Sequence, residues 1–252
     1  MHKDKLLRRN KIEEIVQEKG EVSVIELALY FDVTGETIRA DLNFLEKKGV
    51  LLRTRGGVKK REGTVCVPYD IRLDEYVEDK RKLARKTLEY IEDDSTIYVD
   101  ACTTAYFLGT LLKRKKNLTI VTNSIALVMN LENSGHRIIL LGGEIVYSGK
   151  RTTSIGVDSI ASNMYFDLVI LGMNGCLNLD GPANILDDSI SVSKMIMKRS
   201  DKKLLICEPR KFHTIGYYQY AKFKDFDYVI TGKLNKDDKD KCDTKMIVEI
   251  DI

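Results

Sequence analysis

Cysteine and histidine are scarce in this sequence of 252 residues, which contains five of the former and three of the latter. The cysteines lie far apart and show no paired spacing, so we expect free thiols in a reducing compartment and no disulfide framework. The histidines form no metal-ligand pattern with the cysteines. We therefore predict no zinc site, no other metal and no cofactor.

Long apolar runs are also missing. Stretches such as Arg137–Leu141 are the size of a strand, well short of the roughly 18 residues that a membrane span needs. The charged start of the chain, Met1–Lys5, has no apolar segment behind it, which argues against a secretory signal. These absences predict a cytoplasmic protein without a membrane partner.

The net charge of +3 is unevenly distributed along the chain. Residues 1–61 hold 14 Lys or Arg against 10 Asp or Glu, a net of +4, whereas the other 191 hold 27 against 28, a net of −1. Residues 47–61 carry seven basic groups and no acidic one. A basic segment is commonly no more than a solvated surface, but this one directly follows a helical unit, which favours contact with nucleic acid.

The first sixty residues have the pattern of a helix-turn-helix. A first helix is predicted over Lys5–Lys19, and a second begins after Ser23, which together with Glu26 has the form of a capping box. A third helix, from about 35 to 48, starts after Thr34, whose hydroxyl can accept a hydrogen bond from the first turn. Two helices joined by a short turn can place the second one in a major groove.

The third predicted helix has an apolar face, formed by Ile38, Leu42 and Leu45, and an opposite polar face. A strand-like segment and a Gly56-Gly57 pair follow, which predict a tight hairpin turn or a close backbone approach in a basic wing. The expected DNA-binding residues are Glu36, Thr37, Arg39, Asn43, Lys47, Arg53, Arg55, Gly56 and Gly57. A helical packing module that binds no nucleic acid is the alternative interpretation.

The rest of the chain alternates between two kinds of segment. Val/Ile/Leu-rich strands alternating with helices predict a mostly parallel sheet covered on both faces, and thus an α/β fold. The predicted strands are 95–99, 118–121, 137–141, 166–171, 203–207 and 228–230, and the helices are 78–91, 105–112, 125–131 and 189–199. The predicted domains are 1–58, a DNA-binding domain; 59–75, a charged linker containing Pro68; and 76–252, an effector-sensing α/β domain.

Polar turns follow three of the predicted strands, at the edge where open parallel sheets bind small ligands. They are Asp100–Thr104, Thr122–Ser124 and Gly142–Glu144. Their hydroxyl and backbone N–H groups suit a phosphate, and Asp100 could hold sugar hydroxyls. Each turn alone is commonly ordinary helix capping, but three at equivalent positions favour a ligand site.

These residues resemble those of the DeoR family of bacterial transcription regulators. Residues 8–58 resemble its winged helix-turn-helix, and residues 68–232 resemble its sensor domain, which is similar in fold to ribose-5-phosphate isomerase. The motifs that carry the resemblance are Ser23-Val-Ile-Glu-Leu-Ala28, Thr37-Ile-Arg39, Asp41-Leu42, Arg53 through Gly57, Asp100-Ala-Cys-Thr-Thr104, Thr122-Asn-Ser124, Leu141-Gly-Gly-Glu144 and Gly172-Met-Asn-Gly175.

The sequence departs from the family pattern at several positions, among them Glu208, where the family tends to have aspartate, and Asp187-Asp188, where it tends to have glutamate. Ala40 stands where the family usually has a second arginine, Arg55 where it often has histidine, Cys102 where it has glycine, and Arg210 where it has serine. The resemblance implies a phosphorylated sugar or related metabolite as effector. The expected effector-binding residues are Asp100, Thr103, Thr104, Thr122, Asn123, Gly142, Gly143, Asp188 and Lys211.

The expected function is that of a sequence-specific regulator, a repressor of a carbohydrate-metabolism operon that binds double-stranded operator DNA as a homo-oligomer. The alternative is a sugar-phosphate isomerase or deaminase-like enzyme with an appended helical module, for which Asp100, Asp187, Asp188 and Glu208 are available acids or bases. Only an analogy of fold would place these groups around a reacting carbon, so we predict no catalytic residue. A DNA-binding architectural protein with an inert second domain is a third possibility.

Overall fold

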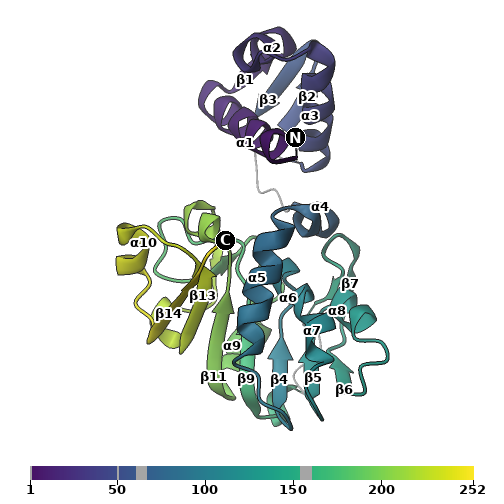
Figure 1. Ribbon diagram of the computed structural model, residues 1–252, viewed down its shortest axis with the longest axis vertical. Coiled ribbons are helices and arrows are strands. Elements are labelled where there is room, and N and C mark those ends of the chain that lie inside the picture. The colour runs from purple at the N-terminus through teal and green to yellow at the C-terminus, as the bar shows by residue number, and fades with distance from the viewer. Residues whose placement is uncertain (1, 50, 61–66, 154–160) are drawn as a thin grey trace. The chain divides into compact units, whose positions relative to one another are not determined.

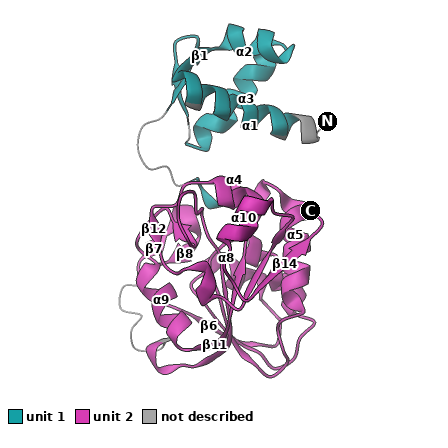
Figure 2. Ribbon diagram, turned by 90° about the vertical axis from the view of Figure 1, so that its left-hand side faces the viewer, with its two compact units in different colours: residues 1–71 teal, residues 72–252 magenta. Residues whose placement is uncertain are grey.

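The computed structural model describes residues 2–49, 51–60, 67–153 and 161–252. It divides into two units, residues 1–71 and residues 72–252, which Figure 2 distinguishes by colour. We call them the first and the second unit, and each has its own buried core.

The first unit consists of three helices and a three-stranded antiparallel sheet (Figure 1). Its helices pack around an apolar core that includes Ile12, Ile38 and Leu42, none of which is exposed. In chain order the elements are α1 (His2–Lys19), β1 (Glu21–Ser23), α2 (Val24–Phe31), α3 (Gly35–Lys47), β2 (Leu51–Thr54) and β3 (Gly57–Lys60).

Both predicted helix starts are confirmed. Ser23 and Glu26 form the capping box: the Glu26 N–H donates to Ser23 Oγ at 3.1 Å, and the Ser23 N–H donates to Glu26 Oε2 at 2.9 Å. At α3 the Thr37 N–H donates to Thr34 Oγ1 at 3.2 Å. Local capping chemistry therefore fixes where the helices of this unit begin.

A buried carboxylate that the sequence pattern did not reveal joins α1 to α3. Asp41 is fully buried, and its two oxygens accept hydrogen bonds from Nε of Arg8 and Nε of Arg9, each at 2.7 Å. The Arg9 guanidinium also lies 3.8 Å from the ring centre of Phe44. The orientation of α3 against α1 thus depends on these two ion pairs as well as on apolar packing.

The two glycines of the wing have different roles. Arg55 and Gly56 form the turn between β2 and β3, and Gly56 has a left-handed φ of +93°. A Cβ on Gly57 would lie 2.4 Å from the carbonyl oxygen of Val22 in β1. The pair therefore provides both the tight turn and the close backbone approach that the sequence left as alternatives.

Gly57→Ala is expected to push β3 away from β1 and to destabilise the first unit by about 1–3 kcal/mol, because the added methyl meets backbone that cannot rotate away. Chemical denaturation followed by circular dichroism would measure the loss. Gly35→Ala is the matched control, since its new methyl meets no atom closer than 3.4 Å. Equal unfolding midpoints for the two variants would contradict the proposed close contact.

The predicted linker, 59–75, is longer than the structure allows. Lys59 and Lys60 belong to β3, because their backbone pairs with β1 and β2 whatever the charge of their side chains. At the other end residues Tyr69–Asp74 form a short helix, α4. Residues 61–66 lie outside the described part of the chain.

The second unit is built on a seven-stranded sheet in the order β14-β13-β11-β9-β4-β5-β6, and every pairing in it is parallel. This confirms the predicted α/β fold. The strands are β4 (Thr96–Val99), β5 (Thr119–Thr122), β6 (Arg137–Leu140), β9 (Phe166–Leu171), β11 (Ser200–Ile206), β13 (Tyr228–Gly232) and β14 (Met246–Ile250). Two small antiparallel ribbons accompany it: β7 (Ile145–Val146) with β8 (Arg151–Thr152), and β10 (Ala183–Asn184) with β12 (Tyr218–Gln219).

Helices cover both faces of the sheet (Figure 1). On one face α5, α6, α7 and α8 pack against strand residues such as Ile97 and Ile170, and on the other α9 packs against residues such as Val169. Because neighbouring residues of a strand point to opposite faces, the apolar runs of the strands supply both cores. The helices are α5 (Val77–Leu88), α6 (Thr103–Tyr106), α7 (Leu108–Leu112), α8 (Ile125–Asn130), α9 (Ile190–Lys198) and α10 (Lys236–Lys241), with 3-10 turns that include η4 (Pro209–His213).

Two local predictions for this unit need correction. The helix expected over 105–112 is two short helices, α6 and α7, since Phe107 bonds to Thr104 in a tighter turn and interrupts the α-helical pattern. The edge strand β14 was not predicted from the sequence. None of the helices in the described residues is both long and apolar enough to cross a bilayer.

Candidate functional site

The outer face of α3 carries the side chains expected to contact DNA. Glu36, Arg39, Asn43 and Lys47 are exposed, whereas Thr37 is half-buried and its hydroxyl lies 3.0 Å from that of Thr34. The side chains on the inner face have no exposed surface. Helix α3 therefore offers polar groups of the size and chemistry that bind base edges.

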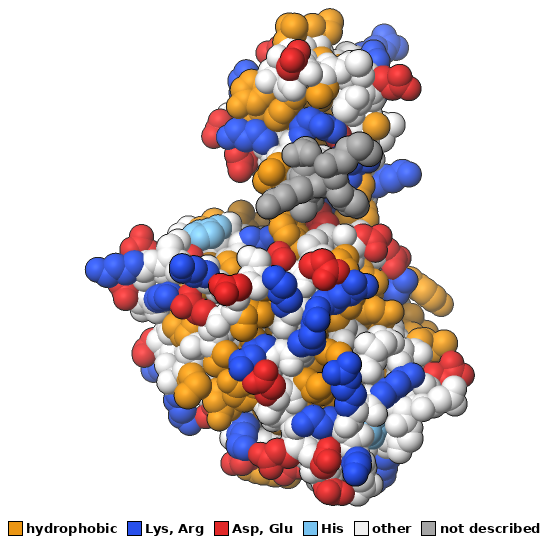
Figure 3. All heavy atoms as spheres, in the orientation of Figure 1, with side chains coloured by type: hydrophobic (Ala, Val, Ile, Leu, Met, Phe, Trp, Pro, Cys, Tyr) orange, Lys and Arg blue, Asp and Glu red, His pale blue; other side chains and the backbone are white. Residues whose placement is uncertain are grey.

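The wing beside α3 is basic. Arg55 is exposed at the turn, and Lys59 and Lys60 are exposed on β3. Arg53 is half-buried on β2, and its buried Nη1 has no hydrogen-bond partner among the described residues. On the visible face of the second unit, by contrast, Figure 3 shows Lys and Arg interspersed with Asp and Glu. The excess positive charge found in the sequence is thus gathered on one module.

The turns after β4, β5 and β9 meet at the carboxyl edge of the sheet, where the parallel strands end. The Ala101 N–H donates to Asn123 Oδ1 at 3.0 Å, and the Gly172 N–H donates to Asp100 Oδ2 at 3.4 Å. Burial raises the pKa of Asp100, although these backbone donors oppose the shift. The structure therefore brings Asp100 and Asn123 together, as the topology predicts.

The hydroxyl groups of these turns are already engaged within the protein. Thr122 Oγ1 donates to the Val99 carbonyl at 2.6 Å and accepts from the Ser124 N–H at 3.0 Å. Thr104 Oγ1 donates to Glu208 Oε2 at 3.2 Å. Thr103 is buried at the first position of α6. In this state, the hydroxyls of Thr104 and Thr122 hold the turns in shape.

The paired glycines after β6 also differ from each other. Gly142 is exposed, and a Cβ there would meet no atom of the described residues within 4 Å. Gly143 has a φ of +127°, and a Cβ there would lie 2.0 Å from the Thr153 carbonyl oxygen. Gly143 is therefore required by a close backbone approach, while Gly142 leaves open space at the edge of the sheet.

Two charged side chains from loops reach the same edge. Arg151 in β8 binds Asp188, which precedes α9, with Nη2 and Oδ2 2.5 Å apart. The positive charge of Arg151 also opposes the rise in pKa that burial causes at Tyr98 and Asp100. Arg151 was missed by the sequence reasoning, because it lies in a two-residue ribbon that has no periodic pattern.

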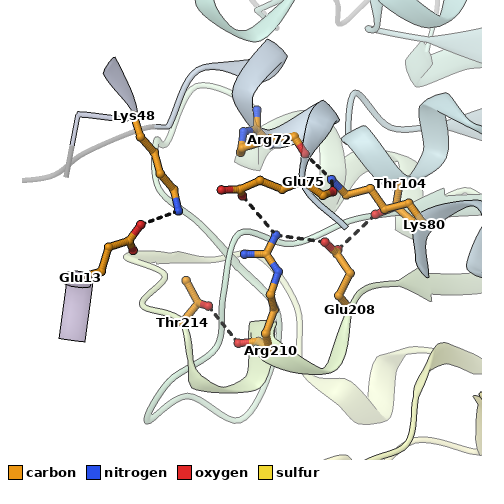
Figure 4. A network of polar contacts seen from close by, with 9 residues as sticks. All are labelled: Glu13, Lys48, Arg72, Glu75, Lys80, Thr104, Glu208, Arg210 and Thr214. Carbon is orange, nitrogen blue, oxygen red and sulfur yellow. Dashed lines mark hydrogen bonds and ion pairs between the residues drawn. The ribbon is translucent and has the colours of Figure 1, made fainter. Parts of the chain in front are cut away.

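A second charged group lies around the end of β11, and Figure 4 shows part of it. Burial would raise the pKa of Glu208, but the charges of Lys211, Arg210 and Lys80 outweigh it and lower the pKa to about 2. Burial, helped by Arg210, lowers the pKa of Lys211 to about 7. Burial also lowers the pKa of Lys80 to about 8. Several positive charges thus converge on one carboxylate, and this arrangement can attract a further anion.

Cys102 occupies the position where a glycine was expected. It caps α6, with the Ala105 N–H donating to its Sγ at 3.3 Å, and a Cβ on Gly172 would lie 2.5 Å from the Cβ of Cys102. Burial raises the pKa of the Cys102 thiol to about 12. Because the thiolate is the reactive form, Cys102 fills space and does not suit nucleophilic chemistry.

Four of the five cysteines lie in the described residues, and all four are free thiols, as expected. Cys102, Cys176, Cys207 and Cys242 are free, and Cys66 lies outside the described residues. Within residues 2–49, 51–60, 67–153 and 161–252, no three His, Cys, Asp or Glu side chains come together as a metal site.

Comparisons with known proteins assign both units. Residues 8–63 match the model of the DeoR-like helix-turn-helix domain, and residues 75–233 match that of the DeoR C terminal sensor domain. The glycerol-3-phosphate regulon repressor of Escherichia coli is 32% identical over 209 residues, which is 81% of this chain and 82% of that protein.

Two more relatives extend over nearly the whole chain. The HTH-type transcriptional regulator IolR of Bacillus subtilis is 28% identical over 91% of this chain and 92% of its own. The L-fucose operon activator of Haemophilus influenzae is 28% identical over 93% and 95%. Among solved structures, ribose 5-phosphate isomerase A from Neisseria gonorrhoeae aligns with a TM-score of 0.40 and 16% identity, covering 55% of this chain and 54% of that one.

Proposed function

The chain belongs to the DeoR family of transcriptional regulators, and we propose that it is a repressor whose first unit binds operator DNA and whose second unit binds a phosphorylated sugar or a related metabolite. The observation that carries the proposal is the pairing of an exposed polar face on α3 with an anion-attracting group of side chains at the carboxyl edge of the sheet.

On the DNA side, α3 enters the major groove and the wing contacts the phosphates. Arg39 has the fork geometry for guanine, and Asn43 has the amide geometry for adenine. Arg55 and the lysines of β3 supply affinity that does not depend on sequence, through released counterions. A homo-oligomer brings two such units to repeated half-sites. Binding of chromosomal DNA would place the protein in the cytoplasm.

On the ligand side, the anionic group of the metabolite binds near Lys211, Arg210 and Arg151. Asp100 and Asn123 face the same edge and suit the hydroxyl groups of a sugar. The proposed effector-binding set remains Asp100, Thr103, Thr104, Thr122, Asn123, Gly142, Gly143, Asp188 and Lys211, to which we add Arg151. For Thr122 and Gly143 we propose that they shape the site, in view of their internal contacts.

The choice of a repressor follows the relative in E. coli, whose name describes repression of a glycerol-3-phosphate regulon. The relative in H. influenzae is named as an activator, so the sign of control varies among similar proteins. We propose no catalytic turnover at the carboxyl edge. The high pKa of the Cys102 thiol and the low pKa of Glu208, already held by arginine and lysine, leave neither group poised for acid, base or nucleophilic work.

Arg39→Ala is expected to lower affinity for the operator by about 10- to 100-fold and affinity for a scrambled duplex by much less, because a bidentate base contact contributes about 1–3 kcal/mol of discrimination. Arg55→Ala is the comparison. It is expected to lower the affinity for both duplexes equally and to reduce the salt dependence of binding by about one released counterion. Titration of the two duplexes at two salt concentrations measures both effects. An equal loss on every sequence for Arg39→Ala would reject its role in reading bases.

A further inference from the structure

Arg210 connects the carboxyl edge of the sheet to the junction between α4 and α5 (Figure 4). Its Nη2 lies 3.1 Å from Glu208 Oε1 and 3.8 Å from Glu75 Oε2. Glu208 belongs to the charged group at the end of β11 and is also held by Thr104. Glu75 lies between α4 and α5, at a point where only 6% of the residue is exposed. One guanidinium therefore contacts a carboxylate at each place.

The junction on which Arg210 acts is conformationally unusual. Tyr76, between the two helices, has a left-handed φ of +52°, which costs energy for a residue with a bulky side chain. The guanidinium of Arg210 lies 4.4 Å from the centre of the Tyr76 ring. Arg210 thus packs on the residue that holds the strain.

A buried lysine fixes the other side of the junction. Lys80 has no exposed surface, and its Nζ donates to the carbonyl oxygens of Arg72 and Glu75, the latter at 2.6 Å. Its ammonium also interacts favourably with Glu208. Lys80 therefore holds the backbone of this segment, while Arg210 contacts the side chains of Glu75 and Tyr76. Both cations interact with Glu208.

Arg210 is also able to respond to an anion. Its Nε is buried and has no hydrogen-bond partner among the residues that the structure describes. Its contact with Glu75, at 3.8 Å, is the longer of its two ion pairs. Burial lowers the pKa of the neighbouring Lys211 to about 7, so that near neutral pH Lys211 is only partly charged. An incoming anion would satisfy the free N–H and compete with Glu75 for the guanidinium.

We propose that Arg210 couples the proposed effector site to the segment that leads to the first unit: an anion bound at the carboxyl edge draws Arg210 away from Glu75 and Tyr76 and loosens the α4–α5 junction. This inference rests on the proposed function and assigns a positioning role to a residue at which the sequence departs from the family pattern. The strained Tyr76 supplies the second state that such coupling requires.

The test is hydrogen exchange of the backbone amides of residues 72–80 in the full-length protein, with inorganic phosphate as the probe. In the wild type, saturating phosphate is expected to speed exchange in this segment about five- to tenfold and to leave the central strands unchanged. Glu75→Gln keeps Arg210 and the other charged side chains at the end of β11 but weakens the ion pair between Arg210 and residue 75. It is expected to show the faster exchange already without phosphate, and to change little when phosphate is added.

Glu78→Gln is the control, since Glu78 is an exposed carboxylate of α5 that forms an ion pair with Arg81 at 2.7 Å. The inference is overturned if Glu75→Gln exchanges like the wild type without phosphate, or if phosphate leaves the wild-type junction unchanged. It is also overturned if phosphate speeds exchange equally in both proteins. Operator affinity of the same wild-type sample, measured without phosphate, tests DNA binding independently.

Discussion

Replacing Asp41 by alanine is expected to destabilise the first unit by about 3–5 kcal/mol and to abolish operator binding. The substitution leaves Arg8 and Arg9 without the buried carboxylate to which both donate at 2.7 Å. It also removes a polar link between α1 and α3, so that α3 loses part of its support. Because small domains have about 5–15 kcal/mol of stability in total, a loss of this size unfolds a measurable fraction of the unit.

Urea denaturation of the full-length protein, followed through hydrogen exchange of α3 amides, would separate the first unit from the second. Glu46→Ala is the matched control, since Glu46 is an exposed acidic residue on the same helix. We expect less than about 0.5 kcal/mol from that change. If Asp41→Ala keeps wild-type protection in α3 and binds the operator normally, the ion pair makes no net contribution and packing alone orients α3.

Replacing Lys211 by methionine is expected to weaken binding of a phosphorylated ligand by at least about 100-fold while making the second unit more stable. The first effect follows from loss of a charge-assisted hydrogen bond in a partly desolvated site. The second follows from the pKa of Lys211, which burial lowers to about 7. An unfolded chain holds that proton up to a pH of about 10. Charging Lys211 at neutral pH therefore opposes folding, and methionine removes this cost.

The stability change has a definite dependence on pH. Between the folded pKa of about 7 and the higher unfolded pKa, the unfolded state binds more protons, so wild-type stability rises with pH across this range. In Lys211→Met this rise of stability with pH should be absent, and the melting temperature should be at least about 2 °C higher near neutral pH. Thermal unfolding at several pH values measures it. Lys194→Met, on the middle of α9, is the control. A lower melting temperature for Lys211→Met would contradict the assignment.

Ligand affinity should depend on whether the Lys211 side chain is protonated. A bound phosphate dianion favours the ammonium form of Lys211, so binding takes up a proton when the pH is above about 7. Affinity is then expected to fall by up to about tenfold per pH unit above that value, and to fall again below about pH 6, where the phosphate itself becomes protonated. Calorimetry with a sugar phosphate, in buffers of different ionisation enthalpy, would reveal the proton uptake. Affinity that is independent of pH would exclude Lys211 as a ligand.

Much of the fold follows from short-range signals in the sequence. Ser23 and Thr34 cap their helices as predicted because capping involves residues within three positions of one another. Six of the parallel strands follow from apolar runs, namely β4, β5, β6, β9, β11 and β13, and the polar turns at their carboxyl ends follow from the parallel topology. The same signals failed for β14 and for the helix that is interrupted at Phe107, whose N–H bonds to the Thr104 carbonyl in a tighter turn.

The sequence by itself therefore indicated the two units, the outer face of α3 and the polar turns at the carboxyl edge of the sheet, because each depends on periodicity or on adjacency along the chain. Only the tertiary structure decided which charges meet: Asp41 with Arg8 and Arg9, Arg151 with Asp188, and Arg210 with Glu75 and Glu208. These partners are mostly tens of residues apart or lie in segments without periodicity. Their energies depend on burial and distance, which no local pattern of residues specifies.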